Sequence, residues 1–94
     1  MTKQRFDSVW DAIEASPAAA ANMKARAELT IALREIIESW EVKQTAAAKR
    51  LGLTQPRLND LLRGRINKFS LDALMMLATK AGLSVRMKIV RPAA

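Results

Sequence analysis

The stretch "QTAAAKRLGLTQPRLNDLLRG", from Gln44 to Gly64, contains two short helical patterns separated by a turn. The first pattern ends at Gly52, because glycine tolerates the left-handed conformation in which many helices terminate. Thr54 is placed to cap the second pattern, and Pro56 lies in its first turn, where the missing N–H does no harm. The stretch therefore predicts two helices joined by a tight turn.

The apolar residues of this stretch have the spacing of a helix-turn-helix. Ala48 lies where the two helices would cross, which leaves no room for a long side chain, and Gly52 lies in the turn, which favours a positive φ. Counted from Gln44, seven restricted positions of an eighteen-residue window carry fitting residues: Ala47, Ala48, Leu51, Gly52, Leu53, Leu58 and Leu61. An ordinary helical hairpin is the alternative, and the agreement at all these positions favours the helix-turn-helix.

The outward face of the second helix carries polar side chains suited to DNA. At about 100° per residue, the leucines of this helix form one inward stripe and leave the opposite face free. The N-terminal residues of a recognition helix lie nearest the bases in the major groove. We therefore expect Gln55 to read adenine, Arg57 to read guanine, and Asn59 to contact a base edge or a phosphate.

Phosphate contacts are expected on both sides of that face. Gln44 is placed to bind a phosphate through its amide and the helix N-terminus, and basic residues follow the second helix. The predicted DNA-binding set is Gln44, Thr54, Gln55, Pro56, Arg57, Asn59, Arg63, Arg65 and Lys68. Asp60 shares the face and could accept from a cytosine amine, but an ion pair with Arg57 or Arg63 within the chain is favoured.

The charge distribution also indicates a polyanionic partner. The 94 residues carry a formal net charge of +7, and no histidine or cysteine. Residues 43–68 hold seven basic side chains and one acidic side chain, whereas residues 1–42 hold five basic and seven acidic ones. A concentrated basic stretch inside a folded domain is typical of proteins that bind nucleic acid, and a solvated basic face is the alternative.

The flanking segments predict further helices in a single domain that spans residues 1–94. Phe6, Val9, Trp10 and Ile13 give residues 1–15 a short amphipathic helix, and a long helix should fill 16–41 after the "SP" pair. The helix-turn-helix then occupies 44–64, and Ser70 caps a core helix over 70–81. This organisation predicts an all-α domain of five helices.

The last segment, residues 83–90, alternates apolar and polar side chains and therefore predicts a strand. Its apolar residues, predicted to form a dimer interface, are Leu83, Val85, Met87 and Ile89. A lone strand has no partner for its backbone N–H and C=O groups. Pairing with the same strand of a second copy is the most economical solution, which predicts a homodimer.

Several function classes are excluded or disfavoured by composition. Without cysteine or histidine the chain lacks thiolate and imidazole ligands, so we expect no metal site, and no cofactor motif is present. No paired carboxylates or glycine-rich phosphate loop support an enzyme. No apolar run approaches the ~20 residues of a membrane span, so we expect a cytoplasmic protein without a membrane partner.

Residues 42–81, through "TQPR", "DLLRG" and "FSLDAL", resemble the Cro/CI-type (XRE) helix-turn-helix repressors. Across nearly the whole chain the sequence is similar to HigA-like antitoxin regulators. The resemblance implies a lambda repressor-like fold and a homodimer that binds a palindromic operator and represses its own operon. It also implies a small RNase-type toxin as partner, and it points to Gln44, Gln55, Arg57 and Asn59 as DNA contacts.

One departure from the family and two alternatives remain. Lys43 stands where threonine is common, so the helix that starts at Gln44 loses its side-chain cap. Members of this group also occur as solitary repressors without a toxin. A helical adaptor that only binds a protein is the other alternative, with Phe6 and Trp10 as its anchor. Packing of these two side chains on the chain's own long helix is favoured over that role.

Overall fold

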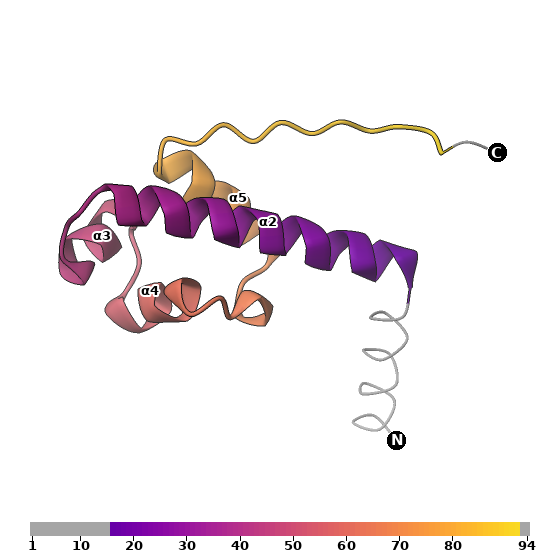
Figure 1. The fold of residues 1–94 in the computed structure, drawn as a ribbon. Helices are drawn as coiled ribbons and strands as arrows, with labels where there is room; N and C mark the ends of the chain where they lie inside the picture. The colour runs from indigo at the N-terminus through magenta and orange to yellow at the C-terminus, as the bar shows by residue number, and fades with distance from the viewer. Residues whose placement is uncertain (1–15, 93–94) are drawn as a thin grey trace, which may run out of the picture.

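The computed structural model describes residues 16–92, which form four α-helices and one short 3₁₀ turn. The helices are α2 (Pro17–Ser39), α3 (Gln44–Leu51), α4 (Gln55–Leu62) and α5 (Leu71–Lys80), and the turn η1 (Ile66–Lys68) joins α4 to α5. The helix predicted within residues 1–15 lies outside the described residues. Figure 1 shows α2 as a long rod, with α3 and α4 packed beneath its C-terminal half and α5 on its other side.

Three of the four helices begin at the side-chain caps that the sequence predicts. Ser16 accepts a hydrogen bond from the backbone N–H of Ala19 at 3.0 Å, and Ser70 accepts one from Ala73 at 3.1 Å. Thr54 caps α4 in the same way. At the start of α3, Lys43 makes no side-chain cap, which confirms the expected loss.

The turn between α3 and α4 has the predicted geometry. Gly52 adopts φ 69°, a left-handed conformation that glycine adopts without steric cost. The backbone N–H of Leu53 donates to the carbonyl of Ala48 at 2.8 Å and so closes the end of α3. Ala48 is 3% exposed at the crossing, where a larger side chain would push the two helices apart.

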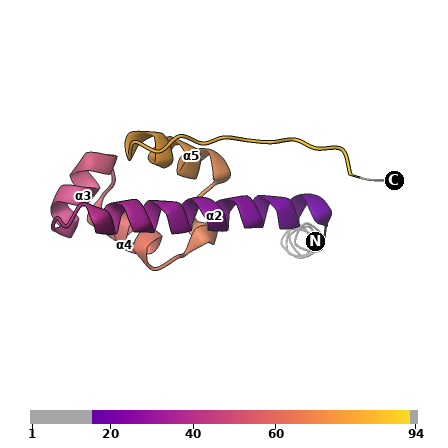
Figure 2. The ribbon, with the colours of Figure 1, turned by 45° about the horizontal axis from the view of Figure 1, so that its top comes forward.

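The core lies between α2 and the three shorter helices. Leu33, Leu51, Leu58, Leu61 and Leu74 have no exposed surface, so each of the four described α-helices contributes at least one fully buried leucine. Phe69, directly after η1, is 2% exposed and belongs to the same cluster. Figure 2, a second view of the ribbon, shows α3, α4 and α5 grouped around α2. This core holds α4 in place while its other side stays free.

The strand predicted over residues 83–90 is wrong for the single chain. In the described part of the chain these residues have no regular secondary structure, and they run in an extended arm back along α5 and α2 (Figures 1 and 2). Met87 and Ile89 are 69% and 88% exposed. A strand requires a neighbouring strand for its backbone groups, and the described residues contain none. The architecture of the described residues is therefore entirely helical.

Candidate nucleic-acid interface

The outward face of α4 combines exposed polar side chains with a rigid support. Thr54, Gln55 and Pro56 are exposed and Asn59 is partly exposed, whereas Leu58 and Leu61 on the opposite side are fully buried. The hydrogen bond from the N–H of Arg57 to the hydroxyl of Thr54, at 3.3 Å, fixes the first turn. The face is thus held by the core beneath it and remains open to a partner.

The other predicted phosphate contacts flank this face. Gln44 is exposed in the first turn of α3, which packs against α4. Arg63, Arg65 and Lys68 are exposed beyond the end of α4. The structure therefore leaves all four side chains accessible to solvent, on the elements that directly adjoin the α4 face.

Arg57 occupies a different place from the rest of the predicted set. Its Nη1 donates to the carbonyl of Lys68 at 2.8 Å, and its Cζ lies 4.1 Å from the centre of the Phe69 ring. The guanidinium is therefore turned toward the loop after α4. Sequence spacing alone predicts this side chain at the DNA-reading end of the helix.

Asp60 forms the expected ion pair within the chain, but the predicted partner is wrong. The carboxylate pairs with Arg65 at 3.1 Å, and neither Arg57 nor Arg63 takes that position. Gly64, with φ 73°, reverses the chain, and the N–H of Arg65 donates to the carbonyl of Asp60 at 3.0 Å. This turn brings Arg65 back over Asp60, which helical spacing does not anticipate.

Arg26 in α2 is a structural contributor that the sequence reasoning missed. Its Nη1 donates to the carbonyls of Ile66 at 3.2 Å and Phe69 at 3.4 Å. The position of Arg26 in the sequence could have indicated this role, because Arg26 shares one helix face with the buried residues Leu33 and Ile37. An arginine on an apolar stripe has to find acceptors inside the fold, and here it holds the loop that follows α4.

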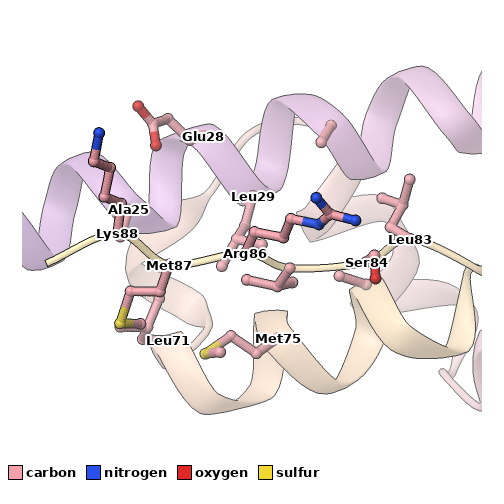
Figure 3. A pocket seen from close by; sticks show the side chains of 13 residues that line it. Ala25, Glu28, Leu29, Leu71, Met75, Leu83, Ser84, Arg86, Met87 and Lys88 are labelled. Atoms are coloured by element: carbon pink, nitrogen blue, oxygen red, sulfur yellow. The ribbon is translucent and has the colours of Figure 1, made fainter.

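A second concave feature lies on the other side of α2. A groove of about 430 Å³ lies between α2, α5 and the start of the C-terminal arm (Figure 3). Leu29, Met75 and Met87 are among its apolar walls, and Glu28 and Lys88 lie at one end. Methionine-lined surfaces adapt readily to apolar partners. This groove is an apolar surface separate from the polar face of α4.

The described residues contain neither of two further site types. Residues 16–92 include no group of three acidic side chains arranged to hold a metal ion. In the same range, no helix combines the length and apolar character needed to cross a membrane.

Comparison with known proteins agrees with this geometry. A helix-turn-helix domain family matches residues 13–90 of the chain. A solved structure with the provisional name of an XRE-family transcriptional regulator is similar to this chain. The two share 31% sequence identity, and the TM-score is 0.71. That similarity covers 80% of this chain and 90% of the other. No curated protein sequence matches the chain.

Proposed function

This chain belongs to the helix-turn-helix domain family and is a DNA-binding transcriptional regulator of the XRE type; from that premise we propose that it represses its own operon by binding a palindromic operator as a homodimer. The observation that carries the proposal is the outward face of α4. It is exposed, polar and fixed to a leucine core by a capped first turn.

Side chains on the α4 face are suited to base contacts, and side chains around it are suited to phosphate contacts. Gln55 and Asn59 lie one helical turn apart, and an amide side chain can pair with both N6 and N7 of adenine. Thr54 and Pro56 accompany them at the helix start. Gln44, Arg63, Arg65 and Lys68 surround the face and would bind phosphates, which sets the register of the helix in the groove.

We expect the full chain to select a two-fold symmetric consensus from a pool of randomised DNA duplexes. In a two-fold dimer of helix-turn-helix domains, the half-sites lie about one helical turn apart, roughly 34 Å. Sequencing of the bound fraction after repeated selection measures this. A bound fraction as random as the starting pool would contradict sequence-specific binding, although salt-sensitive binding to any duplex could persist.

The arm supplies the proposed dimer contact. Val85, Met87 and Ile89 are 40–88% exposed in the single chain, although they alternate with polar residues as a half-buried strand does. Antiparallel pairing of two arms would give their backbone groups partners. The same pairing would bring apolar side chains of the two arms into cross-strand contact.

Removal of the residues after Gly82 is expected to convert a dimer into a monomer. Static light scattering of the full chain should give twice the chain mass of 10.4 kDa, and the truncated chain should give about one chain mass. A double substitution on the polar side, Arg86→Thr with Lys88→Thr, is the matched control and should stay dimeric. A truncated chain that still scatters as a dimer would rule out the arm as the interface.

An antitoxin role is the second part of the proposal. The walls that α2 and α5 contribute to the apolar groove offer a protein-binding surface separate from the α4 face, which suits a regulator that also binds a small RNase-type toxin. A solitary repressor needs no such partner, and a pure adaptor needs no polar α4 face. The adjacent reading frame distinguishes them: its product should arrest growth alone and co-purify with this chain when the two are expressed together. A neighbour without either property would favour the solitary repressor.

A further inference from the structure

We propose that Arg57 is a positioning residue that fixes the loop after α4 and contacts no base. The inference rests on the proposed function, because it takes α4 and the loop that follows as the DNA-binding surface. Arg57 connects α4 to residues 65–69, because its side chain contacts Lys68 and Phe69.

The guanidinium of Arg57 makes two contacts with the loop at once. Cζ lies 4.1 Å from the centre of the Phe69 ring while Nη1 donates to the Lys68 carbonyl at 2.8 Å. A flat guanidinium can stack on an aromatic ring and donate in its own plane at the same time, which a compact ammonium cannot do. The residue type at position 57 therefore matches the loop contact itself.

The position of Arg57 on α4 also directs its side chain toward the loop. At about 100° per residue, Arg57 lies about 160° from Asn59 around the helix axis and only about 40° from Leu61. Leu61 is fully buried, so Arg57 projects from the flank of α4 that borders the core. A side chain on that flank reaches the following loop more directly than it reaches a groove of DNA facing Asn59.

The loop after α4 is held from two sides. Arg26 of α2 donates to the carbonyls of Ile66 and Phe69, and Arg57 of α4 donates to the carbonyl of Lys68. Phe69 is 2% exposed and contacts both arginines, Arg26 through its carbonyl and Arg57 through its ring. Loss of either arginine would free carbonyls next to Lys68, a predicted phosphate contact. Arg57 would thus act on DNA through the position of this loop.

The first test requires no DNA. A guanidinium stacked on a ring should shift the NMR signals of the Arg57 Hδ protons upfield, and Phe69→Leu should remove the shift while keeping an apolar side chain in the core. Ordinary random-coil shifts for these protons in the folded wild-type chain would overturn the proposal. This outcome does not depend on whether α4 binds DNA, so it separates the proposal from the proposed function.

The second test uses the pool of randomised duplexes. Arg57→Lys and Phe69→Leu should each lower the affinity for the consensus selected by the wild-type chain by roughly tenfold, with no further loss in the double variant. Both should select the wild-type consensus, whereas Gln55→Ala should lose preference at one base pair of each half-site. Ile37→Val, a core change away from the loop, is the control for stability alone and should retain wild-type affinity. An Arg57→Lys chain with wild-type affinity, or one that loses preference at a base pair that Phe69→Leu still selects, would overturn the proposal.

Discussion

Leu58→Ala is expected to lower the free energy of unfolding by about 2–5 kcal/mol, which is a large share of the stability of a small domain. Leu58 has no exposed surface and belongs to the core cluster shared by all four described helices. The truncation removes apolar contact and leaves a cavity that the surrounding helices fill only in part. Urea denaturation followed by circular dichroism measures the change.

Leu62→Ala is the matched control for this prediction. Leu62 lies on the same helix and is only partly buried against the core. The same truncation should therefore lower the free energy of unfolding by clearly less than Leu58→Ala does. Equal losses for the two variants would mean that α4 is not fixed through Leu58. In that case the core would not fix α4 at Leu58, and the outward face of α4 would not be held rigid.

The double variant Gln55→Ala with Asn59→Ala is expected to lose sequence-specific binding while the fold persists. An amide that pairs with both atoms of a base edge contributes about 1–3 kcal/mol of discrimination, so two such losses lower specific affinity by roughly 30-fold or more. Both side chains lie on the open side of α4, so stability should change by no more than about 0.5 kcal/mol. Fluorescence anisotropy with the selected duplex and with a scrambled duplex measures the two affinities.

Asn22→Ala is the control for this pair. Asn22 is an exposed asparagine near the start of α2, away from the helix-turn-helix, and its removal should leave both affinities unchanged. The double variant should still bind the scrambled duplex, because phosphate contacts carry non-specific binding. Undiminished preference for the selected duplex would show that α4 does not read the bases.

The local features of the fold were predictable because each depends on neighbours in sequence. Gly52 ends α3 and Thr54 caps α4 through contacts within a few residues, and both follow from residue type. Ser16 and Ser70 begin their helices for the same reason. The inward leucines follow from helical periodicity, which is reliable where the stripe is continuous.

The predictions that were wrong and the contacts that were missed depend on the path of the chain beyond a single helix or strand. Arg26 meets the carbonyl of Phe69 across 43 positions of sequence, and no local pattern records such a pair. Asp60 pairs with Arg65 because Gly64 turns the chain back, whereas helical spacing favours a partner three positions away. The arm carries a strand pattern that the single chain cannot satisfy, since a strand is defined by its neighbour.

The most direct test of the central claim is a map of the protein surface that DNA contacts. Amide NMR signals of the isotope-labelled full chain would be followed while duplex DNA of the selected consensus is added. We expect the largest shifts at the amides of Thr54, Gln55 and Asn59 around the start of α4, with further shifts at Gln44 and at Arg63–Lys68. Shifts concentrated on the α2–α5 groove and the arm, with the signals of α4 unchanged, would contradict the assignment of α4 as the DNA-reading helix.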